Sequence, residues 1–205
     1  SLFALIFFLQ AQSQINGKII HRNYQIKPAI GKIIIDGNLD EETWKTIRPT
    51  TGFFMSFPVD DRLAEQELQT EVKLAYDEHN VYIAAVCKGD DNYVIQTLKR
   101  DNNLQSVDAF GVVIDPVNER TNGFVFGLNP MGVQTELLVS GKTGRREILE
   151  PGRSPSGVNI AWDNKWYSEV KRYPDRWELE IAIPFKSLQF DEGKQVWGIN
   201  FFRMD

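Results

Sequence analysis

Short segments in which apolar and polar residues alternate recur along most of the chain. The segment 70–76 places Val72 and Leu74 on one face. A polar turn at 77–80 follows, and 81–86 then alternates or runs apolar again, so the pair predicts an antiparallel hairpin. The same pattern predicts further strands at 109–115, 123–129, 133–139, 166–172, 177–183 and 195–203.

One stretch predicts a helix. Asp36 and Gly37 form a strong turn signal, and Asp40 after them is suited to cap a short helix near 40–46. Trp44 in that helix would fold back into the core. Short strands at this spacing, about nine or ten in all, with one brief helix, predict an all-β fold, an antiparallel β-sandwich.

The first residues resemble the end of a secretory signal. Residues 2–9 form an uncharged apolar run, and the pair Ala11 and Ser13 follows with the small-x-small spacing of a cleavage site. We therefore expect residues 1–13 to be a signal peptide remnant cleaved after Ser13; a buried N-terminal strand is the alternative. Residues 14–29 would form an extension or an edge strand, and 30–205 the sandwich.

The sequence stops within a strand pattern, so we expect it to be the N-terminal piece of a larger exported protein. That protein would reside in the periplasm, in the outer membrane or at the cell surface. Its C-terminal region, which is missing here, would be an intramolecular partner of the sandwich.

Composition narrows the function classes. A net charge of −5 and an isoelectric point near 5.2 argue against nucleic acid as a partner, because such binding needs a basic face. A single cysteine, Cys87, and two distant histidines support neither a zinc site nor a Ser-His-Asp or Cys-His catalytic group. No catalytic residue is assigned.

Four of the five tryptophans lie in the last quarter of the chain. Trp177 shares a strand face with Leu179 and Ile181, which predicts a core position, and we expect the same of Trp197. Trp162 and Trp166 stand at the entry to a strand, where each has two interpretations. Either one stacks on the flat face of a sugar, or both pack into the core or over the sheet edge.

Polar candidates for a sugar site lie in two loops. Arg100 and Asp101 follow the first hairpin, and a guanidinium beside carboxylates can bind sugar hydroxyls through its planar fork. A structural ion pair is the alternative. Asn129 and Gln134 flank a hairpin turn and could bind a ligand, although turn chemistry alone explains Asn129.

Carboxylates offer two further interpretations. Glu178 and Glu180 share one strand face, so they could form an acid/base pair for glycoside hydrolysis; the favoured interpretation is a solvated outer face. Oxygen-rich loops admit a structural calcium ion as an alternative to plain solvated turns. These loops are Asp60-Asp61, Asp90-Asp91-Asn92 and Asp101-Asn102-Asn103.

The order of several motifs resembles family 9 carbohydrate-binding modules across residues 30–203. The motifs are Asp36-Gly37-x-Leu39-Asp40-Glu41-x-x-Trp44, the hairpin from Val72 to Ala84, Asp108-x-Phe110-x-Val112-Val113-Ile114-Asp115, and the segments that begin at Trp177 and Trp197. Further motifs are typical of the module that begins large envelope-associated proteins with a C-terminal domain of unknown function. They are Arg100-Asp101, Asn129-Pro130-x-Gly132-Val133-Gln134 and Trp162-Asp163-x-x-Trp166.

The resemblance implies a β-sandwich that binds a carbohydrate ligand between aromatic side chains, with calcium in some members. Our first hypothesis is a non-catalytic carbohydrate-binding module of a protein linked to glycan hydrolysis, using Trp162, Trp166, Arg100, Asp101, Asn129 and Gln134. The alternative is a structural or docking β-sandwich that packs on the missing C-terminal region without binding sugar.

Overall fold

The structure is a computed structural model of the 205-residue chain. It describes residues 8–15, 18–55, 62–101, 104, 107–140, 157–190, 193 and 196–204, and side chains from residue 23 onward. Asp60-Asp61 and Asn102-Asn103, which belong to the oxygen-rich loops considered for calcium, lie outside the described residues.

One sheet has seven strands in the order β2-β1-β12-β6-β7-β8-β9. Neighbours in it pair antiparallel, except that β1 and β12 run parallel. Its strands are β1 (Phe8–Ile15), β2 (Lys18–Gln25), β6 (Ala109–Asp115), β7 (Asn122–Leu128), β8 (Gln134–Ser140), β9 (Val158–Asn159) and β12 (Val196–Met204).

The second sheet has five strands in the order β10-β11-β5-β4-β3. All its pairs are antiparallel except the short parallel contact of β3 with β4. Its strands are β3 (Lys27–Pro28), β4 (Thr70–Tyr76), β5 (Asn80–Lys88), β10 (Tyr167–Tyr173) and β11 (Arg176–Pro184). The helical elements are α1 (Glu42–Thr46), η1 (Gln66–Leu68) and η3 (Phe185–Ser187).

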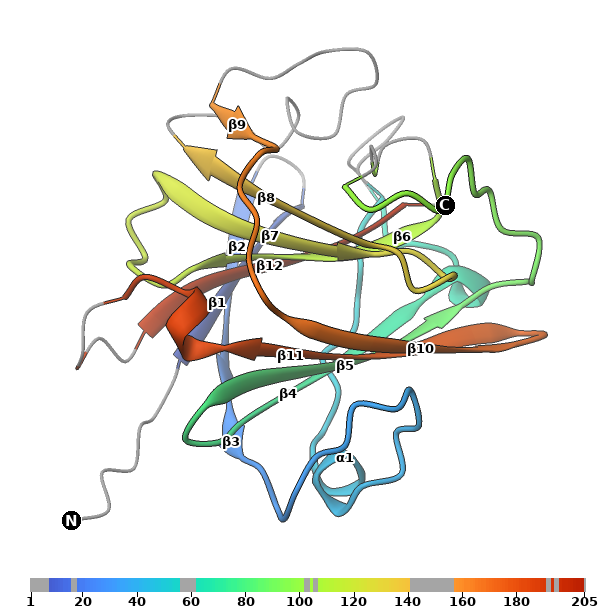
Figure 1. Cartoon of the computed structure of the whole chain (residues 1–205), viewed down its shortest axis with the longest axis horizontal. Coiled ribbons are helices and arrows are strands. Elements are labelled where there is room, and N and C mark those ends of the chain that lie inside the picture. The colour runs from blue at the N-terminus through green and yellow to red at the C-terminus, as the bar shows by residue number, and fades with distance from the viewer. Residues whose placement is uncertain are drawn as a thin grey trace.

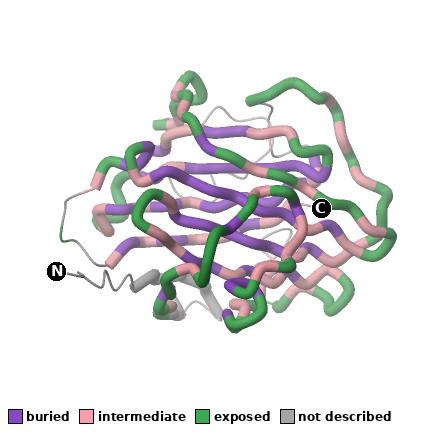
Figure 2. The backbone as a smooth tube through the Cα atoms, turned by 60° about the horizontal axis from the view of Figure 1, so that its bottom comes forward, coloured by how far each residue is buried: buried purple, intermediate pink, exposed green. Residues whose placement is uncertain are grey.

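The two sheets stack face to face, so the predicted all-β sandwich is confirmed (Figure 1). Buried residues concentrate in the central strands, while the connecting loops are mostly exposed (Figure 2). The main core contains Trp177 and Trp197, each 1% exposed, which confirms the position predicted from strand alternation. The hairpin β4–β5 and the strands β6, β7 and β8 also lie where the sequence predicted them.

The N-terminal segment occupies the seven-stranded sheet. Strand β1 lies between β2 and β12, with Phe8 beside Val196 in the parallel ladder. The expected cleavage after Ser13 would cut inside this strand. Cleavage remains a prediction.

The segment around α1 covers the outer face of the five-stranded sheet (Figure 1). Trp44 is fully buried there, in a second apolar cluster with residues of both the α1 segment and the sheet. The helix starts after Glu41 rather than at a capping Asp40, and no side-chain cap is formed. The proposed Asp40 cap is therefore wrong. Glu41 instead accepts a hydrogen bond from the backbone N–H of Ile34 at 3.0 Å.

Glu180 departs from the favoured expectation of a solvated outer face. Its residue is 0% exposed, and one carboxylate oxygen accepts the indole N–H of Trp44 at 2.9 Å. The other oxygen accepts the backbone N–H groups of Asp36 and Gly37, both at 3.0 Å. The alternation along β11 gave no sign that the α1 segment lies over this face. Glu178 remains partly exposed and pairs with Arg176.

Because of the hydrogen bonds that Glu180 accepts, we expect Glu180→Ala to lower the stability of the fold strongly. The substitution leaves three N–H donors without their acceptor, and each such buried group costs about 1–3 kcal/mol. We expect the free energy of unfolding, measured by urea denaturation, to fall by about 3 kcal/mol or more. Glu178→Ala is the control, because a partly exposed pair contributes about 1 kcal/mol or less. Equal losses in the two variants would contradict the assigned role.

The loss of stability caused by Glu180→Ala should also depend on pH. Burial raises the pKa of Glu180 to about 7, although the N–H groups of Trp44, Asp36 and Gly37 act to lower it. An unfolded glutamate titrates near pH ~4.3, so between these values the folded protein holds more protons. The stability that Glu180 contributes therefore falls as pH rises through this window. We expect the stability difference from Glu180→Ala to shrink from about pH 4.5 to about pH 7.5.

Candidate functional site

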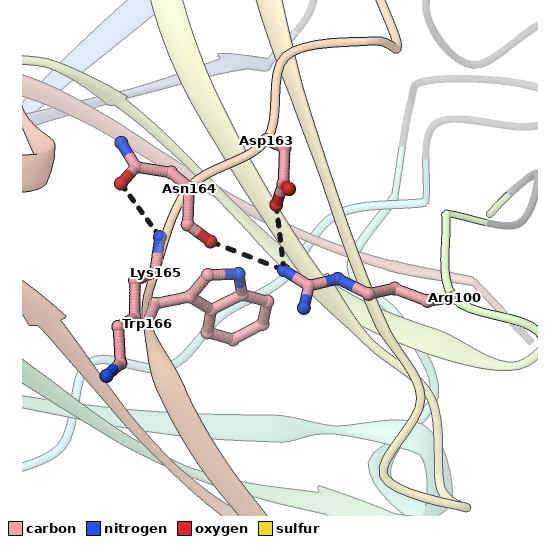
Figure 3. A pocket seen from close by; sticks show the side chains of 5 residues that line it. All are labelled: Arg100, Asp163, Asn164, Lys165 and Trp166. Carbon is pink, nitrogen blue, oxygen red and sulfur yellow. Dashed lines mark hydrogen bonds and ion pairs between the residues drawn. The ribbon is translucent and has the colours of Figure 1, made fainter.

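An open pocket of about 490 Å³ lies where the chain enters β10. It is lined by Arg100 from the loop between β5 and β6, and by Asp163, Asn164, Lys165 and Trp166 from the segment between β9 and β10 (Figure 3). Segments more than sixty residues apart in the sequence therefore converge on one opening.

A buried carboxylate organises this opening. Glu136 on β8 is 1% exposed, and it lies opposite Phe126 of β7 on the face toward the other sheet. One of its oxygens accepts a hydrogen bond from Nη2 of Arg100, and the other accepts a hydrogen bond from the indole N–H of Trp166 at 3.1 Å. A charge buried in this way requires partners, because an unpaired one is costly. Arg100 and Trp166 meet that requirement.

Burial dominates the electrostatics of the pair. Loss of solvent raises the pKa of Glu136, while the hydrogen bonds from Arg100 and Trp166 act in the opposite direction. The hydrogen bond to Glu136 raises the pKa of Arg100, so the guanidinium keeps its charge. The pocket therefore presents a fixed cation anchored from beneath by a buried anion.

The segment that forms the other wall is fixed at both ends. Nη2 of Arg100 donates to Asp163 Oδ1 at 3.4 Å and to the carbonyl of Asn164 at 3.3 Å (Figure 3). On the other side, Asn164 Nδ2 donates to the carbonyl of Ser187 at 2.8 Å, and Ser187 Oγ donates to the carbonyl of Lys165 at 3.0 Å. Element η3 thereby supports the wall of the pocket.

The guanidinium is the exposed polar centre of the site. The Arg100 side chain is 46% exposed, and that of Asp163 is 82% exposed. The contacts of Arg100 with the described residues all use Nη2. A planar donor fork beside a carboxylate and a backbone carbonyl is suited to neighbouring hydroxyl groups.

Comparison with known proteins identifies the family. The model described as carbohydrate family 9 binding domain-like matches residues 35–205. The chain belongs to this family. Family 9 modules are binding domains without catalytic activity, which confirms the prediction that this module is not an enzyme. No curated protein matches the chain.

Two solved structures with TM-scores above 0.5 share this fold. A family 9 module from Caldicellulosiruptor kristjanssonii in complex with glucose has a TM-score of 0.54 and 15% identity, over 88% of this chain and 78% of that one. A proposed carbohydrate-binding protein from Bacteroides uniformis has a TM-score of 0.57 and 11% identity, over 87% and 81%. The Caldicellulosiruptor module with cellotriose has a TM-score of 0.48 and 17% identity; this chain spans 66% of its length, and 78% of this chain is matched.

The two tryptophans considered as sugar platforms have different positions in this family 9 fold. Trp166 is 4% exposed and packs edge-to-face on Phe126 at 5.4 Å between ring centroids, so its ring faces are covered. It lines the pocket from beneath rather than forming an exposed wall. Trp162 is half-buried against Phe124 and Phe126, at 5.1 and 5.8 Å, and is not among the residues that line the pocket.

The remaining predicted residues divide between the site and its support. Asp101 is exposed beside Arg100, and its Oδ1 accepts the backbone N–H of Glu136 at 3.5 Å. Gln134 donates to Ser168 Oγ at 2.9 Å, which links β8 to β10. Both therefore hold the strands and loop around the pocket.

Asn129 lies at the turn between β7 and β8. It is 2% exposed, and its Oδ1 accepts the backbone N–H groups of Met131 and Val133, both at 2.9 Å. The side chain is therefore used to close the turn between β7 and β8. This placement agrees with the alternative that turn chemistry explains Asn129; its contact with sugar hydroxyls stays a prediction.

Sequence reasoning did not select Glu136, Asn164 or Lys165. Alternation gave no clear signal for Glu136, because it groups Glu136 with Gln134 and Ser140, whereas Leu137 and Val139 share the other face. Asn164 and Lys165 carried no signal either, since a polar loop between two tryptophans is typical of many surface turns.

Metal and membrane features add little to the site. Among the described residues, no group of three or more His, Cys, Asp or Glu side chains is placed to hold a metal ion. Asp90 Oδ1 instead accepts the backbone N–H of Asn92 at 3.1 Å, as in an ordinary turn. Calcium remains a prediction. None of the described helices is long and apolar enough to cross a membrane.

The organising role of Glu136 can be tested by substitution. Glu136→Ala leaves Arg100 and the indole N–H of Trp166 without their acceptor, and we expect it to lower the free energy of unfolding by about 3–5 kcal/mol. Asp163→Ala is the control, because its exposed contact with Arg100 contributes about 1 kcal/mol or less. Urea denaturation followed by circular dichroism measures both. A loss below about 1 kcal/mol for Glu136→Ala would contradict the assignment.

Proposed function

We propose that this module binds a carbohydrate, without catalysing its conversion, in the pocket at Arg100. The observation that carries the proposal is the half-exposed guanidinium held against the buried Glu136 carboxylate. Asp163 and Asn164 lie beside it, so donors and acceptors converge on one opening. Sugar hydroxyls both donate and accept hydrogen bonds, and such a mixed set of groups matches them.

Pre-organisation favours this role. The segment 163–165 is held by Arg100 on one side and by Ser187 on the other before any ligand arrives. Ordering loops and long side chains on binding costs free energy, and a wall already fixed avoids much of that cost. An open pocket of this volume suits one sugar unit at the end or edge of a chain.

Any aromatic contact would come from outside the set of residues that line the pocket. The faces of Trp166 are covered, whereas Trp162, which does not line the pocket, is only half-buried. We assign any stacking on the sugar to Trp162 and the polar contacts to Arg100, Asp101 and Asp163. The family membership and the glucose complex of the Caldicellulosiruptor module support a hexose as the ligand class.

We further infer that the module lies near the N-terminus of a larger exported protein linked to glycan hydrolysis. The apolar run at residues 2–9, followed by Ala11 and Ser13, supports export. The periplasm, the outer membrane and the cell surface are all consistent with such a signal.

A docking sandwich is the second candidate, and one observation favours it. Four of the five tryptophans, Trp44, Trp166, Trp177 and Trp197, are buried, which leaves little tryptophan surface for a sugar. Apolar side chains are exposed instead, including Ile34 at 56% and Ile160 at 71%. If the module docks on the C-terminal region, deleting it should unfold or mislocalise the remainder without changing glycan binding.

Titration of the chain with sugars tests the first proposal. We expect glucose, cello-oligosaccharides or another hexose chain to produce saturable heat or tryptophan fluorescence changes at up to millimolar concentration. Arg100→Lys keeps the charge but loses the planar fork, and we expect about tenfold weaker binding, which corresponds to about 1.4 kcal/mol.

The control is Glu78→Ala, an exposed residue in the turn between β4 and β5. Its affinity should equal that of the unchanged chain. No response to xylan, cellulose, mannan and host-type glycans, or equal binding by Arg100→Lys, would contradict the assigned site.

A further inference from the structure

Strand β10 forms one edge of the five-stranded sheet. It is joined to β11 by the two-residue turn Pro174-Asp175, with Tyr173 paired to Arg176. The closing pair of such a hairpin is hydrogen-bonded across the ladder, and successive residues alternate between the two sides of a strand. The backbone N–H and C=O groups of Ser168, Val170 and Arg172 therefore point toward the free edge.

The side chains of β10 are self-complementary about its centre. The strand reads Tyr167-Ser168-Glu169-Val170-Lys171-Arg172-Tyr173. If a second copy runs antiparallel to it with Val170 opposite Val170, Glu169 lies opposite Lys171 and Tyr167 lies opposite Tyr173. Opposite charges and aromatic pairs are the cross-strand neighbours that stabilise antiparallel sheets.

We propose that two copies of this chain pair through β10 about a twofold axis at Val170, forming a continuous ten-stranded sheet. The axis places the outward N–H and C=O of Val170 against their counterparts, which is the arrangement that an antiparallel hydrogen-bonded pair requires. Glu169 and Lys171 are exposed, and the Nζ of Lys171 also donates to Asn38 Oδ1 at the surface, where a second copy can reach both side chains. This interface is isologous and closes after two copies.

Neighbouring registers are disfavoured by the same sequence. An axis at Ser168 would place Lys165 opposite Lys171, which brings like charges together. An axis at Arg172 would place Val170 opposite Pro174, which has no N–H to donate. Registers centred on Glu169 or Lys171 would pair like charges and direct the wrong backbone groups at each other. The register at Val170 places opposite charges across from each other and lets the outward N–H and C=O groups form hydrogen bonds.

The dimer would carry two copies of the pocket in a fixed arrangement. The pocket-lining residues Lys165 and Trp166 immediately precede β10, so the two pockets would lie near opposite ends of the paired strands. With about 3.4 Å per residue, Tyr167 of one copy would stand roughly 20 Å along the strands from its counterpart. Two sites at this separation could bind one polysaccharide together. This consequence rests on the proposed function, whereas the pairing does not.

Sedimentation velocity without sugar tests the pairing. The contact is a single strand edge, so we expect weak dimerisation, visible as a rise in mean mass between about 10 μM and about 1 mM. Glu169→Lys alone and Lys171→Glu alone should each weaken dimerisation at least tenfold. The double variant, Glu169→Lys with Lys171→Glu, restores the opposite charges and should recover it. Circular dichroism confirms that each variant is folded.

Matched controls carry the same charge changes away from β10. Glu78→Lys and Lys186→Glu alter exposed residues in other elements and should leave dimerisation unchanged. A chain that stays monomeric at about 1 mM, larger assemblies than dimers, single variants that match their controls, or a double variant that does not recover would each overturn the proposal.

Discussion

The burial of the Glu136 carboxylate is the constraint on which the candidate site depends. Its position on an inward-facing side of β8 removes it from water, and the cost of that burial must be met by hydrogen-bond donors. Arg100 and Trp166 supply them from two other segments. The loop that carries Arg100 and the entry to β10 are therefore brought together by one charge, and the pocket is the opening that remains above it.

A second buried carboxylate is also stabilised by an indole N–H, but its other hydrogen-bond donors are uncharged. Glu180 accepts the indole N–H of Trp44, as Glu136 accepts that of Trp166. The remaining donors to Glu180 are backbone N–H groups, which leave no charged group at the surface. That contact fastens the α1 segment to the sheet. At Glu136 the remaining donor is a half-exposed guanidinium, which can also face a ligand.

The alternation of apolar residues was sufficient to predict the strands from β4 to β8 and from β10 to β12, the sandwich and the core positions of Trp177 and Trp197, because those depend on local periodicity. It did not predict β1, which lies largely in the segment expected to be a signal remnant. It failed for Glu180, since the segment that covers this residue lies more than 130 residues earlier in the chain. For the site, the sequence indicated Arg100 and its region but could not show that Trp166 is buried or that Asn129 closes a turn. Those outcomes depend on contacts across the sandwich.

The indole N–H signals of Trp166 and Trp44 in a two-dimensional proton–nitrogen spectrum provide the most direct test of the central claim. Both indoles donate to buried carboxylates, but only Trp166 adjoins the pocket. On addition of a bound hexose, the account predicts a saturable shift of the Trp166 signal and a constant Trp44 signal. A constant Trp166 signal at saturating sugar, or a shift at Trp44 alone, would contradict it.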